Sequence, residues 1–195
     1  MNEEKLKIIK EKALEEHIPI IMDDTLEVID TYLKEMKPKR ILEIGTAVGY
    51  SAICFSKYLA EDGIIDTIER DEERIAEAKE NIKEMKLDSK INIYEGDAVE
   101  ILPTLNNKYD AIFIDAAKGK YTFFLEQALR MLDEKGIIFA DNILYKGYVL
   151  SDYNKHKQRT AVRNLREYIK QTTENIELET QILEVGDGLA ITQKK

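Results

Sequence analysis

The sequence predicts an α/β fold with a mostly parallel, doubly wound sheet, helices on both faces and a C-terminal β-hairpin. Short apolar runs of strand length alternate with longer segments of helical periodicity along most of the 195 residues, as is typical of a parallel sheet. The first apolar run, 41–44, ends at Gly45, and a helical pattern begins at Gly49. Two alternating segments flank Gly186-Asp187-Gly188, and these predict the hairpin.

Two amphipathic helices are expected before the first strand. Apolar residues at helical spacing place them at 2–16 and 24–36, and Asp23 or Asp24 is the expected cap of the second. Lys37-Pro38-Lys39 then separates this helix from the strand. Residues 1–36 are expected to form a lid over a ligand, a dimer contact, or a simple layer packed on the sheet.

The rest of the chain continues the alternation of strands and helices. Further strands are predicted at 63–69, 91–95, 109–114 and 136–140, with hairpin strands at 176–185 and 188–193. Further helices are predicted at 71–85, at 98–105, around 124–132 and at 159–173. Ligands of such a sheet are expected outside the carboxyl ends of its strands.

Composition favours a single domain over 1–195. A mass of 22.5 kDa and a hydrophobic content of 44% suit one sizeable core. The one cysteine, Cys54, rules out a disulfide within the chain and suggests a buried thiol in a reducing cytosol. The N-terminal residues contain no apolar segment of signal or membrane-spanning length, so we expect a cytoplasmic protein that does not enter a membrane.

The net charge of −9 argues against general coating of nucleic acid. It leaves room for a local basic patch, because the cations cluster in one short region. That region contains Lys146, Lys155, His156, Lys157, Arg159, Arg163 and Arg166.

The turn after the first strand predicts a nucleotide site. The spacing of Gly45 and Gly49 departs from the dinucleotide fingerprint Gly-x-Gly-x-x-Gly, which disfavours a pyrophosphate and therefore NAD. Glu69 ends the second predicted strand, at the offset of an acid that accepts from ribose hydroxyls. Together with Glu43, it favours S-adenosylmethionine, which has a cationic tail and no phosphates.

A second group of polar residues follows the fourth and fifth predicted strands. Asp115 ends one strand and Asp141-Asn142 ends the other, so three oxygen donors are expected at one rim. Such donors suit Mg²⁺, Mn²⁺ or Ca²⁺, although Asp141-Asn142 could equally be turn formers. Lys118 lies three residues after Asp115 and is either a base for a substrate hydroxyl or an ordinary solvated lysine.

These residues together resemble a known enzyme family. Glu43-Ile-Gly45-Thr46, Glu69, Gly96-Asp97-Ala98, Asp115-Ala-Ala-Lys118 and Asp141-Asn142 resemble the metal-dependent class I O-methyltransferases of the catechol and caffeoyl-CoA type, over about 18–188. The chain is most similar to the bacterial branch that methylates 5-hydroxyuridine at the wobble position of tRNA, through Ile18-Pro19-Ile20, 45–51 and 115–119. The resemblance implies a Rossmann-like methyltransferase domain and a homodimer.

The resemblance also implies roles for individual residues. The implied S-adenosylmethionine contacts are Met22, Glu43, Gly45, Thr46, Tyr50, Ser51, Glu69, Asp97, Ala98 and Asp115. Asp97 is expected both to accept from the adenine amino group and to cap the helix at 98–105. The implied metal ligands are Asp115, Asp141 and Asn142, and the implied catalytic residues are Lys118 and Asp115. The implied substrate contacts are Lys118, Lys120, Tyr121, Lys146, Arg159 and Arg163.

Methyl transfer is expected to be an in-line displacement at the sulfonium by a substrate oxyanion. The substrate must chelate, as both a catechol and 5-hydroxyuracil do. The branch resemblance favours a tRNA anticodon loop, whose phosphates the basic side chains could hold while Tyr121, Tyr145 or Tyr148 stack on bases. A solvated basic helix face is the other interpretation of these cations. A small-molecule catechol or caffeoyl-CoA-like O-methyltransferase is the alternative, and a noncatalytic nucleotide- or RNA-binding module is a third possibility.

Overall fold

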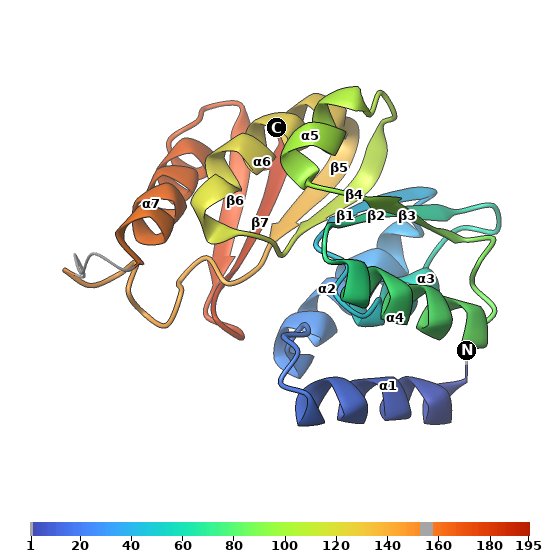
Figure 1. Cartoon of the computed structure of the whole chain (residues 1–195). Coiled ribbons are helices and arrows are strands. Elements are labelled where there is room, and N and C mark those ends of the chain that lie inside the picture. Colours follow the sequence, from blue (N-terminus) through green and yellow to red (C-terminus); the bar gives the residue numbers. More distant parts are fainter. Residues whose placement is uncertain (1, 153–157) are drawn as a thin grey trace. The chain divides into compact units, whose positions relative to one another are not determined.

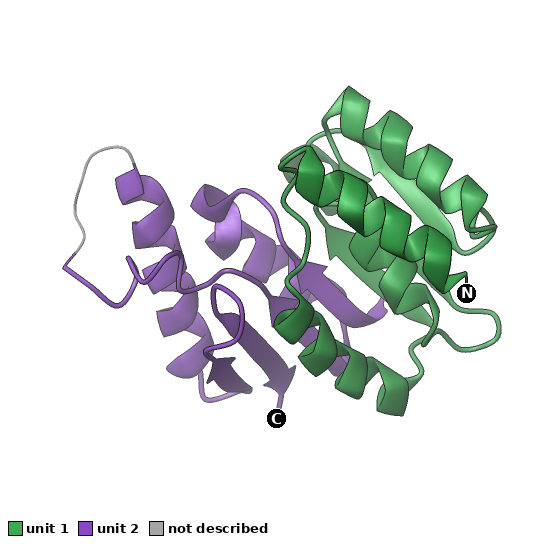
Figure 2. Ribbon diagram, turned by 90° about the horizontal axis from the view of Figure 1, so that it is seen from below, with its two compact units in different colours: residues 1–105 green, residues 106–195 purple. Residues whose placement is uncertain are grey.

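The computed structural model describes residues 2–152 and 158–195, and these form two compact units, 1–105 and 106–195 (Figures 1 and 2). The predicted Lys155, His156 and Lys157 of the basic region lie outside the described residues. Within the described part, no helix is both long and apolar enough to span a membrane. One domain over the whole chain stays a prediction.

The first unit contains three parallel strands in the order β3-β2-β1. The strands are β1 (Arg40–Ile44), β2 (Ile64–Glu69) and β3 (Ile91–Glu95). The helices are α1 (Glu3–Glu15), α2 (Asp23–Met36), α3 (Tyr50–Ser56), α4 (Glu72–Glu84) and α5 (Ala98–Ile101), with a 3₁₀ turn, η1 (Leu102–Thr104). β1 and β2 are buried along most of their length, as expected of strands covered on both faces.

Local signals set several helix starts in this unit. Asn2 caps α1 by accepting from Lys5 N, and Asp71 caps α4 by accepting from Glu73 N and Arg74 N. The predicted aspartate cap of α2 is wrong, because the cap residue is Met22 and it makes no side-chain hydrogen bond. Asp24 instead bonds the backbone N–H of its neighbour Thr25, inside the first turn.

The second unit contains four strands in the order β4-β5-β7-β6. They are β4 (Tyr109–Ile114), β5 (Leu132–Ala140), β6 (Leu178–Leu183) and β7 (Leu189–Lys194). The helices are η2 (Lys118–Lys120, a 3₁₀ turn), α6 (Tyr121–Met131) and α7 (Arg159–Thr173). β4 and β5 are parallel, whereas β6 and β7 pair antiparallel, which confirms the predicted α/β class and C-terminal hairpin.

β5 begins earlier than predicted. It pairs Tyr109 with Leu132 and then Ala111 with Ile137, so the register shifts between the two pairs. Gly136 lies at the end of this irregular stretch, where a side chain has no room. An added Cβ would lie 2.7 Å from Leu132 Cδ1 and 3.0 Å from the Tyr109 carbonyl oxygen. The apolar run in the sequence located only the regular end of the strand, 136–140.

Candidate active site

The loop between β1 and α3 has the sharp turn that the sequence predicted. Gly45 and Gly49 have φ of 108° and 81°, and Ala47 has φ of 45°, so three residues in five lie in the left-handed region. The N–H groups of Gly45 and Thr46 donate to the Ile68 carbonyl at 3.1 and 3.2 Å, which anchors the loop to the end of β2. The loop is therefore held to the strand that carries Glu69.

Glu43 lies at the centre of a buried polar network beneath this loop. Its carboxylate accepts from Ser51 Oγ and from Thr67 Oγ1, each at 2.5 Å, and Thr67 Oγ1 also lies 2.6 Å from Thr46 Oγ1. Glu43 has no accessible surface. In this structure it stabilises the loop from below, as does Ser51, and their direct contact with the cofactor stays a prediction.

Thr67 is a site residue that the sequence interpretation missed. β1 and β2 pair Glu43 with Thr67, and Thr67 is fully buried. In sequence its only signal was a hydroxyl next to Asp66 in the predicted strand 63–69, and the pairing with Glu43 came from the strand register. A buried carboxylate needs such donors, since ionised oxygens without partners are costly.

Glu69 and Asp97 follow adjacent strands of the same unit. Glu69 Oε2 accepts from Ala47 N at 2.9 Å, and Oε1 accepts from the N–H groups of Arg70 and Asp71 at 2.8 and 3.0 Å. Asp97 Oδ1 accepts from Val99 N at 2.9 Å, which confirms its predicted helix-capping role, and its Oδ2 pairs with Arg70. Both side chains are partly exposed, so they are accessible to a nucleoside.

The remaining predicted cofactor positions in this unit differ in accessibility. Met22 is 51% exposed, whereas Tyr50 and Thr46 are buried and Ala98 is half-buried. The nearby Cys54 is also buried, and burial raises the pKa of its thiol to about 12, so it stays protonated. The buried-thiol prediction is confirmed.

In the second unit, the predicted metal donors do come together at one rim. Ile114 pairs with Ala140 in the β4–β5 register, so Asp115 and Asp141 leave adjacent strand ends, and Asp141 N donates to the Ile114 carbonyl at 3.0 Å. Lys118 Nζ donates to Asn142 Oδ1 at 2.6 Å and to Asp115 Oδ1 at 3.2 Å. One cationic group therefore already binds two of the three predicted donors.

The third donor, Asp141, lies deeper. It is 1% exposed, and its Oδ1 accepts from Asn142 N at 2.7 Å. Burial, followed by the charge of Asp115, raises the pKa of Asp141 from 3.8 to about 7. Asp187 contributes in the same direction, although the sequence offered no signal for it beyond its place in the hairpin turn.

This pKa predicts a pH dependence of stability. Between pH 3.8 and about 7 the folded protein holds the Asp141 proton and the unfolded chain does not, so the contribution to the free energy of unfolding falls as the pH rises. Urea unfolding in the presence of a chelator at several pH values between 4 and 8 would measure it. Asp141→Asn should flatten the dependence, and an equally steep profile in that variant would contradict the assignment.

The predicted substrate residues split into exposed and buried groups. Lys120, Lys146, Arg159 and Arg163 are exposed. Tyr121 is fully buried, and its hydroxyl donates to the backbone carbonyls of Asp141 at 2.7 Å and Ile114 at 3.3 Å. Its predicted contact with substrate is wrong, because a ring enclosed by protein has no face on which a base can stack.

Arg166 is also a structural residue. Its guanidinium donates to the carbonyls of Val149, Tyr148 and Ser151, which attaches the loop after β5 to α7. Its membership in the basic cluster came from sequence proximity alone. Backbone carbonyls, and not phosphates, are its partners in this structure.

The loop that follows Asn142 is anchored to the hairpin turn. The N–H of Ile143 donates to the Gly188 carbonyl, and the Lys146 N–H donates to Asp187 Oδ1. Gly188 has φ of 92°, and an added Cβ would lie 2.3 Å from Leu144 Cγ. The Leu144 side chain fills the space of a Cβ, so this position requires glycine.

Gly188→Ala should lower the free energy of unfolding by about 2–4 kcal/mol, since it adds both backbone strain and overpacking. Gly147→Ala is the matched control: its φ is 73°, but nothing lies within 4 Å of an added Cβ, so only strain applies. Chemical denaturation of both variants would measure the difference. Equal losses would show that the contact with Leu144 is unimportant.

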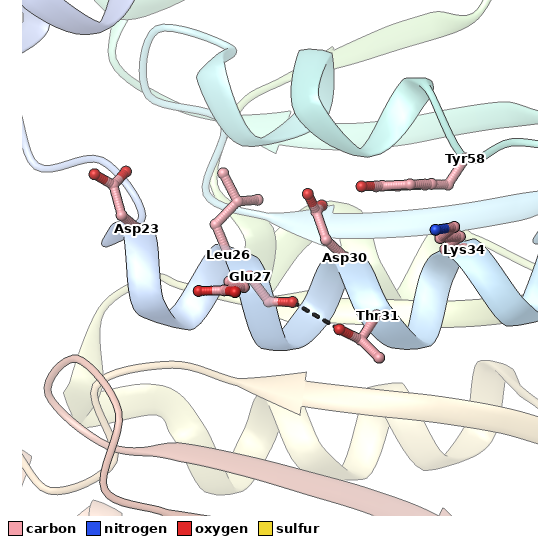
Figure 3. Close-up of a pocket in the computed structure, with 7 residues that line it drawn as sticks. All are labelled: Asp23, Leu26, Glu27, Asp30, Thr31, Lys34 and Tyr58. Atoms are coloured by element: carbon pink, nitrogen blue, oxygen red, sulfur yellow. Dashed lines mark hydrogen bonds between the residues drawn. The ribbon is translucent and has the colours of Figure 1, made fainter.

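A pocket lined by none of the predicted site residues lies along α2 (Figure 3). Its volume is about 350 Å³, and it is lined by Asp23, Leu26, Glu27, Asp30, Thr31, Lys34 and Tyr58. Asp30 Oδ2 accepts from Lys57 at 2.7 Å, so this wall carries an ion pair. No role in the reaction is assigned to it.

Comparison with known proteins agrees with this geometry. A catechol O-methyltransferase from Niastella koreensis is 36% identical over 162 residues, covering 78% of this chain and 72% of that protein. A caffeoyl-CoA O-methyltransferase from Populus kitakamiensis is 30% identical over 83% of this chain and 72% of its own length. The structure of a candidate caffeoyl-CoA O-methyltransferase from Staphylococcus aureus has a TM-score of 0.90 and 34% identity, covering 97% and 92% of the two chains.

The fold and the similarity to these O-methyltransferases define an S-adenosylmethionine-dependent methyltransferase of Rossmann-like architecture. A methyltransferase structure from Podospora anserina, solved with SAH, shares that fold at a TM-score of 0.84, with 25% identity over 98% of this chain and 86% of that one. Residues 2–195 match the O-methyltransferase family model, and the chain belongs to that family.

Proposed function

We propose that this chain transfers a methyl group to a hydroxyl that has a second oxygen donor beside it, and that the reaction depends on a divalent metal. The observation that supports this most is the contact of Lys118 Nζ with oxygens of both Asp115 and Asn142. Two of the oxygens proposed to bind the metal are thus within hydrogen-bond distance of the proposed base.

The residues of the rim fit a hard cation. The described ranges 2–152 and 158–195 contain no group of three or more His, Cys, Asp or Glu side chains that could hold a metal, but the proposed set is two carboxylates and an amide. Asp115, Asp141 and Asn142 would hold Mg²⁺, Mn²⁺ or Ca²⁺ through oxygen. Such an ion would acidify and orient the substrate hydroxyl. In this structure the Lys118 ammonium binds two of the three, Asp115 and Asn142.

The chain's own residues would then handle the proton and the alignment. Lys118 is 21% exposed on its side chain, so its Nζ can reach substrate while being shielded from bulk water. In its neutral amine form, with the metal in place of the ammonium at Asp115 and Asn142, Lys118 would accept the hydroxyl proton as the oxygen forms a bond to the methyl carbon and the carbon–sulfur bond breaks. The β1–α3 loop and Glu69 would bind the S-adenosyl donor, which leaves as S-adenosylhomocysteine.

We further propose 5-hydroxyuridine at the wobble position of tRNA as the substrate. The proposed base, Lys118, lies on η2, which packs against α7. Exposed cations lie on both elements: Lys120 is on η2, and Arg159 and Arg163 lie one turn apart on α7. These side chains suit anticodon-loop phosphates. Tyr145 and Tyr148 pack edge to face, with ring centroids 5.9 Å apart, and are half-buried, so they retain surface for a base.

A small catechol is the second candidate substrate. It is favoured by the names of the relatives, which include a catechol and a caffeoyl-CoA O-methyltransferase. The same rim would serve it, since neighbouring hydroxyls chelate as well as the 5-hydroxyl and 4-carbonyl of the modified uracil.

Methyl transfer from labelled S-adenosylmethionine, with Mg²⁺ or chelator, tests both proposals. Label in tRNA as 5-methoxyuridine, absent with chelator, would support the tRNA proposal, whereas transfer only to a catechol would overturn it. Methyl transfer that continues in the presence of chelator would contradict the proposed dependence on a divalent metal. Arg159→Ala with Arg163→Ala should weaken tRNA methylation and increase its salt tolerance while sparing the catechol reaction.

We also propose a cytoplasmic homodimer in which residues 1–36 form the contact or a lid. The apolar side chains of Ile8, Leu14 and Met22 are more than half exposed in this region, which supports a covering partner. Light scattering of the purified protein, repeated with Ile8→Lys, would test the dimer. A monomeric mass at micromolar protein concentration would contradict the proposed dimer.

A further inference from the structure

The hydroxyl of Tyr121 lies directly beneath the proposed metal-binding rim. It is 2.7 Å from the carbonyl oxygen of Asp141 and 3.3 Å from that of Ile114. Asp141 is itself a proposed metal ligand, and Ile114 directly precedes another proposed ligand, Asp115. One side chain therefore contacts the backbone at the carboxyl ends of both strands.

These contacts bear on where the carboxylates point. Rotation of the peptide that follows Ile114 would swing Asp115, and rotation of the peptide that follows Asp141 would turn the backbone from which Asn142 projects. A donor shared between the two carbonyls opposes both rotations, because a buried carbonyl that loses its partner is costly. The direct Asp141 N–H to Ile114 carbonyl bond, at 3.0 Å, joins the same two strand ends.

Tyr121 also connects the rim to the proposed base. It is the first residue of α6 and follows η2, the turn that begins with Lys118. The chain from Lys118 to Tyr121 is only one helical turn long, so fixing the hydroxyl limits where the Lys118 backbone can lie. The ammonium of Lys118 then reaches Asp115 and Asn142 from a defined position.

The ring itself is immobilised by its neighbours. Tyr121 has no exposed surface, and its ring packs edge-on against Tyr168, with centroids 5.7 Å apart and planes at 73°. Phe124, one turn further along α6, packs at 6.3 Å. Close packing of this kind leaves the hydroxyl one position relative to the strand ends.

We propose that Tyr121 is a positioning residue, which holds in place the two strand ends that carry the proposed metal ligands. The inference rests on the proposed function, because it assumes that the rim binds a metal. It assigns Tyr121 no contact with substrate or with the reacting atoms.

Tyr121→Phe tests the proposal, with Tyr168→Phe as the matched control. Both changes remove one buried hydroxyl from the same tyrosine pair, but only the hydroxyl of Tyr121 donates to the carbonyls of Ile114 and Asp141. Titration with Mn²⁺, followed by the resonance of the free ion, should show about tenfold weaker binding for Tyr121→Phe. Tyr168→Phe should bind Mn²⁺ as the wild type does, and both should bind S-adenosylmethionine normally.

Three results would overturn the inference. Wild-type Mn²⁺ affinity in Tyr121→Phe would show that the hydroxyl does not position the rim. Equal weakening in both variants would assign the effect to general loosening of the core. A wild-type protein that binds no Mn²⁺ would overturn the proposed metal site itself, and the inference with it.

A measurement on the unaltered protein keeps the proposal testable if Tyr121→Phe does not fold. With ¹³C-labelled tyrosine, addition of Mg²⁺ should shift the Cζ resonance of Tyr121, because its hydroxyl contacts the backbone that the ion draws together. The Cζ resonance of Tyr168 should stay unchanged. An unchanged Tyr121 Cζ resonance in a sample that binds Mg²⁺ would contradict the proposed link between the hydroxyl and the metal site.

Discussion

Asp141→Ala is expected to lower methyl transfer by ~1,000-fold, because the loss of one charged ligand removes several kcal/mol of metal-dependent stabilisation of the reaction. The structure gives this residue a special place: it is the buried member of the rim, and its charge is already opposed by Asp115. Initial rates with excess Mg²⁺ and saturating S-adenosylmethionine would measure the loss.

The matched control is Asp133→Ala, which removes an exposed carboxylate from the other end of β5. It should leave both the rate and the metal affinity unchanged. Asp141→Ala should also keep its affinity for S-adenosylmethionine, and should be no less stable than the wild type at pH 8 in chelator, since it removes a buried charge. An Asp141→Ala enzyme with full activity would eliminate the metal role.

Glu69→Ala is expected to weaken S-adenosylmethionine binding by about 10- to 100-fold, the loss that follows from removing hydrogen bonds to a charged group. In the structure Glu69 also accepts from Ala47 N and so holds the β1–α3 loop. Calorimetric titration with S-adenosylmethionine would measure the affinity. Glu69→Gln should lose less, because its amide oxygen can still accept from the loop.

Glu80→Ala serves as the control, since it removes an exposed carboxylate from α4 in the same unit. Its affinity for the cofactor should equal that of the wild type. Glu69→Ala should retain Mn²⁺ binding, just as Asp141→Ala should retain S-adenosylmethionine binding. Normal cofactor affinity in Glu69→Ala would contradict the ribose assignment.

Local sequence signals located most of the elements. The apolar runs at 41–44 and 91–95 became β1 and β3 with little change in bounds, and the helix predicted at 159–173 is α7. Asp97 was correctly expected to cap a helix, because that hydrogen bond spans only two residues. The helix it caps is shorter than predicted, since Leu102 begins a 3₁₀ turn that contains Pro103.

The same reasoning failed where residues far apart in sequence meet. Tyr121 was predicted to contact substrate, yet long-range packing with Tyr168 encloses it. Arg166 was grouped with a local basic cluster by sequence proximity, and the structure gives its guanidinium backbone carbonyls 15 to 18 residues earlier as partners. Residue type and local spacing do not report which side of a helix the rest of the chain covers.

The sequence by itself determined the strand–helix alternation, the left-handed turn at Gly45 and Gly49, and the presence of acids at the ends of four strands, because periodicity and steric freedom are local properties. Only the tertiary structure decided that Glu43 is enclosed with Ser51 and Thr67, and that Lys118 bridges Asp115 and Asn142. Those distances depend on strand register and on which groups lose contact with water. Both are set by packing across the sheet, and no short stretch of the chain encodes them.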